Sequence, residues 1–127
     1  MTGLKAALSE VLTVTEDDGA LTVVYEGMMA SLRVVRIADE LDMVSLTQPL
    51  AWDIKLDNTL RQRVSEQAVR TMLGSVVLVE RIDGGRKLAD VMLRYNFPVS
   101  GLGDEALRML VLLVLSTGAG VRAEFTA

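Results

Sequence analysis

Residues 106–115 read ALRMLVLLVL, and Arg108 is the only charged side chain in this stretch. Coiled into a helix, the segment has one apolar stripe, formed by Ala106, Met109, Leu110 and Leu113. The side that carries Arg108 is apolar as well, because it holds Val111, Leu112 and Leu115. A helix on the surface of a domain needs only one apolar stripe, so a further element or a second molecule must cover the other.

The second stripe predicts a protein interface. If Val111, Leu112 and Leu115 stayed in water, each would forgo about 1.5–3 kcal/mol of transfer free energy. A two-fold homodimer is the simplest source of a cover, and burial inside the domain is the alternative. Trp52 is a further candidate, since exposed aromatic side chains dominate interface energies, although core packing is its other possible role. We therefore expect partner or dimer contacts at Arg108, Val111, Leu112, Leu115 and Trp52.

Length and composition bound the class of protein. The 127 residues have the length of one domain, 1–127, which on folding buries roughly 65–70% of the surface of the unfolded chain. The chain has no Cys, which excludes disulfides and thiolate zinc sites and favours the cytoplasm. Its 13 basic and 17 acidic residues give a net charge of −4, which argues against a nucleic-acid partner. The longest unbroken apolar run, residues 109–115, is far shorter than the roughly 20 residues of a membrane span, so no membrane partner is expected.

The first half of the chain predicts one helix and three strands. Leu4, Leu8 and Leu12 recur at helical spacing, which favours a helix over a signal peptide, with a turn at residues 16–19. The strands are expected over residues 21–26, 31–37 and 43–54, with turns at 27–29 and 38–42. Pro49 cannot donate to a ladder, so it indicates an edge position or the exit of the third strand.

The second half predicts a helix, a hairpin and the apolar helix. Asp57 or Asn58 caps the first of these helices, which ends at Gly74. Its apolar residues recur at intervals of four: Leu60, Val64, Ala68 and Met72. Strands over residues 76–80 and 88–97 flank the turn residues 83–85, whose glycines allow positive φ. Pro98 closes that hairpin; Asp104 and Glu105 then open the apolar helix, and Gly118 is expected to end it.

Strict alternation over residues 88–97 predicts a half-buried strand. One face is apolar and is expected to lie under helices: Ala89, Val91, Leu93, Tyr95 and Phe97. The element order is therefore helix, three strands, helix, two strands, helix. This order predicts an α+β two-layer domain in which helices cover an antiparallel five-stranded sheet.

Scattered positions resemble a known family. They are Trp52-Asp53, Gly74 at the head of a strand, the segment LRYNFPVSGL at residues 93–102, and the apolar helix with Leu107. The chain resembles the YbjN family and the fold that this family shares with the type III secretion chaperones, over nearly its whole length. It departs from the pattern at Ser65 and Ala68, where relatives tend to carry asparagine. The resemblance implies a non-enzymatic binding protein; secretion chaperones of this fold are small acidic homodimers that hold an extended partner segment on exposed apolar surface.

The residues offer little chemistry of their own. Without His there is no imidazole base and no nitrogen ligand for zinc. The acidic clusters at residues 16–18 and 39–42 lack the spacing of a calcium loop and are interpreted as solvated turns. We expect no catalytic residue, cofactor or metal, and a cytoplasmic homodimer that binds a protein partner in a chaperone-like way. The alternatives are a signalling regulator or structural subunit of a hetero-complex and, third, an enzyme that uses carboxylates.

Overall fold

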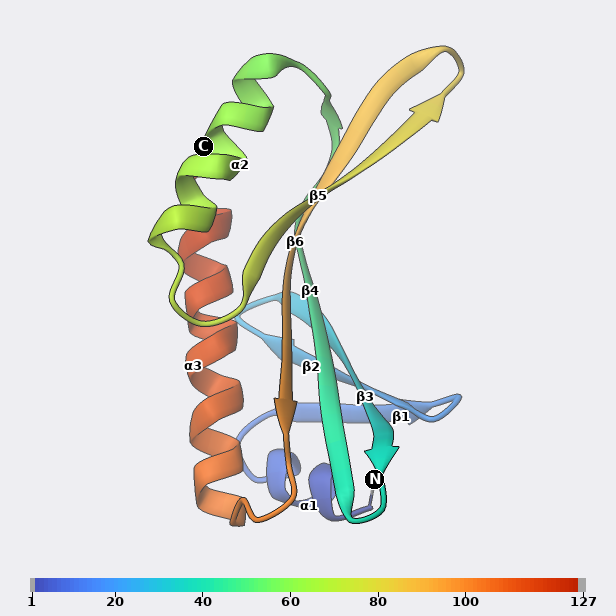
Figure 1. Cartoon of the computed structure of the whole chain (residues 1–127), viewed down its shortest axis with the longest axis vertical. Helices are drawn as coiled ribbons and strands as arrows, with labels where there is room; N and C mark the ends of the chain where they lie inside the picture. The colour runs from blue at the N-terminus through green and yellow to red at the C-terminus, as the bar shows by residue number, and fades with distance from the viewer. Residues whose placement is uncertain (1, 126–127) are drawn as a thin grey trace.

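Six antiparallel strands form the sheet of the computed structural model, which describes residues 2–125 (Figure 1). In chain order the elements are α1 (Thr2–Ser9), β1 (Thr13–Asp17), β2 (Ala20–Tyr25), β3 (Met28–Ala38), β4 (Leu41–Lys55), α2 (Asn58–Arg70), β5 (Ser75–Asp83), β6 (Arg86–Pro98) and α3 (Asp104–Arg122). The strands lie in the order β1-β2-β3-β4-β6-β5. The α+β class and the antiparallel sheet are thus confirmed.

The sheet has one strand more than the sequence predicts. Residues 13–17 form β1, which pairs with β2 from Thr13 opposite Val24 to Asp17 opposite Ala20. The predicted turn at residues 16–19 is shorter, and only Asp18 and Gly19, both at positive φ, lie between the strands. The β-branched residues Thr13, Val14 and Thr15 are the signal for this strand. The acidic residues 16–18 that follow them were interpreted as a turn, so the strand was not predicted.

The long strand β4 joins the two halves of the sheet. It pairs with β3 as far as Thr47 and with β6 from Met43 to Lys55, with irregular register after Pro49 and after Ala51. Pro49 therefore lies within the strand and not at its exit, just beyond the last residue that pairs with β3. A proline is tolerated there because no β3 partner needs its missing N–H.

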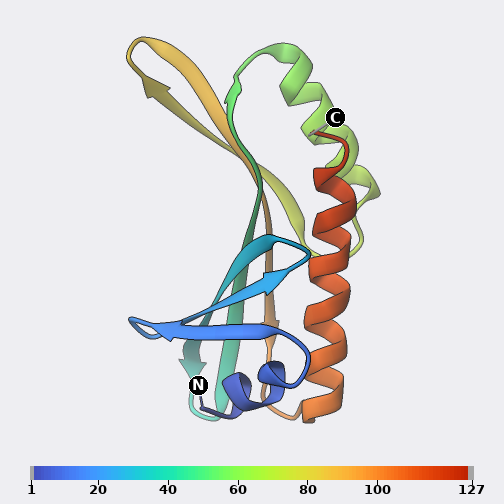
Figure 2. The ribbon, with the colours of Figure 1, turned by 180° about the vertical axis from the view of Figure 1, so that it is seen from behind.

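The face predicted for β6 is confirmed. Ala89, Val91 and Leu93 are fully buried, Phe97 is nearly so, and Tyr95 stacks on Phe97 with ring centroids 5.4 Å apart. Helices α2 and α3 lie on the same side of the sheet, while the tip of the β5–β6 hairpin projects away from the other strands (Figures 1 and 2). The hydrophobic core lies between this face of the sheet and the helices.

Helix α2 is shorter and less buried than its sequence pattern predicts. Asp57 caps it by accepting a hydrogen bond from the Leu60 N–H at 2.8 Å, and the helix ends at Arg70. Leu60 and Val64 are buried as expected. Ala68, however, is exposed, and Met72 lies beyond the helix with 95% of its surface exposed. The buried residues of α2 thus lie only in its first two turns, and the period of four does not continue into the core.

Helix α3 runs past Gly118, which the sequence predicts as its end. The reason lies beneath the helix, where the Gln48 side chain of β4 is fully buried and its Nε2 donates to the Leu115 carbonyl at 3.3 Å. A Cβ on Gly118 would overlap the Gln48 amide. Gly118 thus allows close approach of helix and sheet, and it does not stop the helix. Gln48 Oε1 has no hydrogen-bond partner within residues 2–125.

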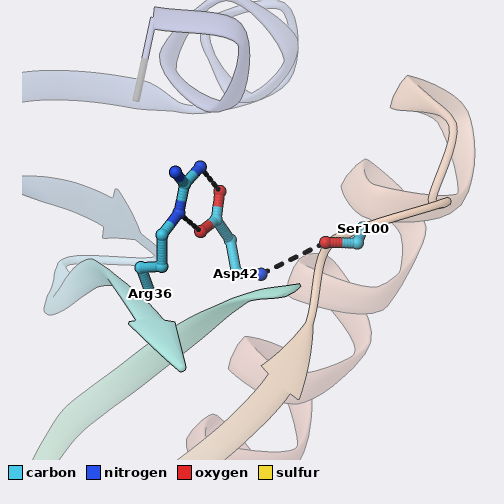
Figure 3. A network of polar contacts seen from close by, with 3 residues as sticks. All are labelled: Arg36, Asp42 and Ser100. Carbon is cyan, nitrogen blue, oxygen red and sulfur yellow. Dashed lines mark hydrogen bonds and ion pairs between the residues drawn. The ribbon is translucent and has the colours of Figure 1, made fainter. Parts of the chain in front are cut away.

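A polar network links the β3–β4 turn to the loop between β6 and α3 (Figure 3). The Arg36 Nε donates to Asp42 Oδ1 at 2.9 Å and its Nη2 donates to Oδ2 at 3.4 Å. The Asp42 backbone N–H donates to Ser100 Oγ at 3.2 Å, and the Val99 N–H donates to the Asp42 carbonyl at 3.0 Å. The hydrogen bond from Arg36 is the main reason why the pKa of Asp42 is lowered, and it raises the pKa of Arg36.

Replacing Asp42 by asparagine should flatten the acid side of the stability profile. The folded state lowers the pKa of Asp42, so its stabilising effect is present above the ordinary value of about 4 and is lost as pH falls through the folded value. Both side chains are open to solvent, so the effect is small. Melting temperatures of the wild type and Asp42→Asn, taken from about pH 6 to about pH 2, should converge on acidification. Parallel curves would contradict this assignment.

Candidate functional site

The stripe of α3 that the sequence analysis assigned to an interface is the one that faces the core, and the other stripe is exposed. The inner stripe, defined by the buried residues of the helix, consists of Leu107, Val111, Val114, Leu115, Gly118 and Val121. The outer stripe, defined by its exposed residues, consists of Ala106, Met109 and Leu113. The stripe predicted to face the sheet is therefore largely the exposed one. Two of the residues predicted at an interface, Val111 and Leu115, are completely buried within the chain and have no surface to offer a partner.

Helix α1 supplies part of the cover, as the alternative of burial inside the domain predicts. Leu4, Ala7 and Leu8 belong to the same buried cluster as the inner stripe, and α1 packs against α3. Arg108 links α3 to the turn that follows α1, because its Nη1 lies 3.3 Å from Glu10 Oε2. The predicted contact residue Arg108 is thus an internal link in the isolated chain. Leu112, beside it on the helix, is half-buried.

Trp52 remains accessible. It lies in β4 next to the register irregularity, with 58% of its surface exposed and Arg122 of α3 over its ring at 6.0 Å. Trp52 lines a hollow of about 350 Å³ with the β2–β3 turn. Behind it, Asp53 has φ of 58°, and its N–H donates to Asp90 Oδ1 at 3.0 Å while its carboxylate pairs with Arg81. Asp53 is therefore held by β6 through Asp90 and by β5 through Arg81, directly after the exposed Trp52.

A larger groove of about 650 Å³ lies between α2 and α3. Its walls come from the end of α2, the loop that follows it and the last turns of α3: Gln67, Arg70, Thr71, Met72, Leu73, Thr117, Gly120 and Val121. Thr117 lies one helical turn beyond Leu113, so the groove opens beside the outer stripe. The groove lining named here contains one cation and no carboxylate.

The charges of α2 are distributed unevenly. Arg61 pairs with Glu80 at 2.7 Å, and Arg63 donates to the Glu124 carbonyl and lies 5.3 Å from the centre of the Phe125 ring. The side chain of Arg70 makes no hydrogen bond or ion pair with residues 2–125. A pair between Glu66 and Arg70, which their spacing predicts, does not form. Arg70 is thus a cation at the groove without a counter-charge of its own.

The apolar side chains around the groove were missed by the sequence analysis. Val69 is 87% exposed and Met72 is 95% exposed, although the pattern places Met72 in the core. The available signal was Thr71, a β-branched residue followed within three positions by Gly74, which favours a helix end before Met72.

The acidic clusters do not assemble. Within residues 2–125 no three acidic side chains come together in a way that could hold a metal ion. The same residues contain no helix whose length and apolar content would allow it to span a bilayer. The arrangement brings together apolar side chains and one cation, and chemically it is suited to contact with another molecule's surface.

Comparison with known proteins identifies the fold. No protein-family model matches the chain, and no curated protein matches it in sequence. The crystal structure of YbjN, a candidate transcription regulator from E. coli, is similar with a TM-score of 0.66 and 16% sequence identity, over 97% of this chain and 88% of that one. Likeness at this identity concerns the backbone and not the function. The chain therefore has a YbjN-like fold, as the resemblance in its sequence predicts.

Proposed function

We propose that this chain is a non-catalytic protein-binding module, chaperone-like in its mode of action, that works as a homodimer in the cytoplasm. The observation that carries the proposal is the exposure of large apolar side chains on the helix side of the sheet. They are Val69, Met72, Met109 and Leu113. Exposed apolar side chains that lie next to one another are typical of protein interaction sites, and Met109 and Leu113 are neighbours on α3. Methionine suits such sites, because its flexible side chain adapts to different partners.

The homodimer is best placed on the outer stripe. Met109 and Leu113 lie one helical turn apart and are 58% and 51% exposed. Pairing the two helices about a two-fold axis would cover both residues in each copy. This assignment replaces the predicted contacts at Val111 and Leu115, which the core already uses.

Replacing Leu113 by glutamate should convert the dimer into a folded monomer. The substitution places a charge in each copy of the interface, and the cost of desolvating it should weaken the dimer by at least about tenfold. Light scattering measures the mass and circular dichroism confirms the fold. Ile82→Glu is the matched control, because Ile82 is also apolar and even more exposed but lies on the β5–β6 hairpin. A wild type that is monomeric alone would contradict the homodimer and favour a subunit of a hetero-complex.

The absence of catalysis is part of the same proposal. Its support is the chain's lack of His and Cys and a main groove whose lining includes no carboxylate. Turnover on a panel of hydrolase substrates, abolished by changing one Asp or Glu to its amide, would contradict it.

A further inference from the structure

We infer that the groove between α2 and α3 binds a short apolar segment of a partner protein, and that a carboxylate of this segment pairs with Arg70. The inference rests on the proposed function as a protein-binding module and names the surface and the chemistry of the segment. It concerns the groove and not the outer stripe, so it can fail while the homodimer stands.

The walls of the groove are suited to apolar side chains. Met72, Leu73 and Val121 line it, and Met72 is almost wholly exposed without a partner segment. Gly120 opens the wall on α3, because a Cβ built there would meet no atom within 4 Å. The volume of about 650 Å³ lies in the range of ligand pockets, roughly 300–1,000 Å³, and admits a few side chains of a segment.

The positive charge of Arg70 favours a bound segment that carries a negative charge. Arg70 is the charged member of the lining, and it makes no ion pair with residues 2–125. Arg61 and Arg63 on the same helix already have partners, which leaves Arg70 to an external carboxylate. A guanidinium binds a carboxylate through two parallel hydrogen bonds, and the Gln67 amide in the same lining can donate a further one.

The net charge of the whole chain does not oppose this choice. Although the chain carries −4, charges further away than about 8 Å are largely screened at physiological ionic strength. Among the residues that line the groove the charged one is Arg70, and Glu66, one helical turn before it, accepts a hydrogen bond from Gln62 instead. An acidic residue among apolar ones is the pattern that complements this lining.

An array of synthetic 12-residue peptides tests the inference with the full-length chain. Each peptide carries three leucines at varied spacing and one test position occupied by Glu, Gln or Lys. The wild type should prefer Glu over Lys by on the order of tenfold in Kd, and Arg70→Glu should reverse this preference. Gly120→Leu should fill the groove and reduce binding of all three peptide sets, while circular dichroism stays unchanged.

Arg86→Glu is the matched control, since it makes the same change of net charge at the exposed start of β6, next to the β5–β6 turn. It should bind as the wild type does. Binding of peptides without charge preference, or a preference that Arg70→Glu leaves intact, would overturn the inference and leave the protein-binding function standing. Failure to bind any peptide would also overturn it, and a dimer measured by light scattering would then still separate this failure from that of the proposed function.

Discussion

Replacing Leu115 by alanine should lower the free energy of unfolding by about 2–5 kcal/mol. Leu115 is completely buried, on the inner stripe of α3 beside the Gln48 side chain. Its removal forgoes the transfer free energy of the lost methyl and methylene groups and leaves a cavity that the surrounding helices and sheet close only in part. Urea denaturation followed by circular dichroism measures the loss.

Leu113→Ala on the same helix is the control for this experiment. Leu113 is half exposed on the outer stripe, so its truncation should cost far less in a monomeric sample at low concentration. The two variants remove the same atoms from positions two residues apart, and helix propensity changes equally in both. Equal losses, or a larger loss at Leu113, would mean that the two stripes of α3 are reversed in solution.

Replacing Gly118 by alanine should destabilise the chain, by about 1–3 kcal/mol, although alanine is the better helix former. The new methyl group would overlap the Gln48 amide, and that side chain is fully enclosed and hydrogen-bonded to the Leu115 carbonyl. Helix and sheet must therefore move apart, or Gln48 must leave its rotamer. Thermal melting of the variant measures the effect.

Two further variants make the Gly118 result specific. Gly120→Ala lies in the same helix with open space at the new Cβ, so it should leave stability unchanged or raise it by up to about 1 kcal/mol. Combining Gly118→Ala with Gln48→Ala should recover part of the loss, because the smaller side chain makes room for the methyl group. Losses that simply add in the double variant would contradict the contact between Gly118 and Gln48.

Local pattern alone was enough to predict the class of fold and every element except β1. Alternation over residues 88–97 placed Ala89, Val91 and Leu93 on the covered face of β6, because a strand has a period of two and only one register buries the apolar set. The cap at Asp57 and the end of β6 at Pro98 follow from single residues in the same way. β1 was not predicted, because its edge position leaves four of its five residues exposed and so gives it no apolar alternation.

The assignment of faces on α3 could be decided only by the tertiary structure. A helix that is apolar all round carries no information about which stripe is buried, so the sequence alone placed Leu113 inside and Leu115 outside. Residues distant in the sequence determine which stripe of α3 is buried: α1 packs against the helix, and Gln48 of β4 lies under Gly118. The exposure of Met72, which follows from the end of α2 at Arg70, is likewise visible only in the folded structure. The sequence by itself determined the three helices and five of the six strands, because their identity depends on the period of apolar residues. Which side of an apolar helix faces water depends on contacts between residues far apart in the chain, and only the folded structure contains them.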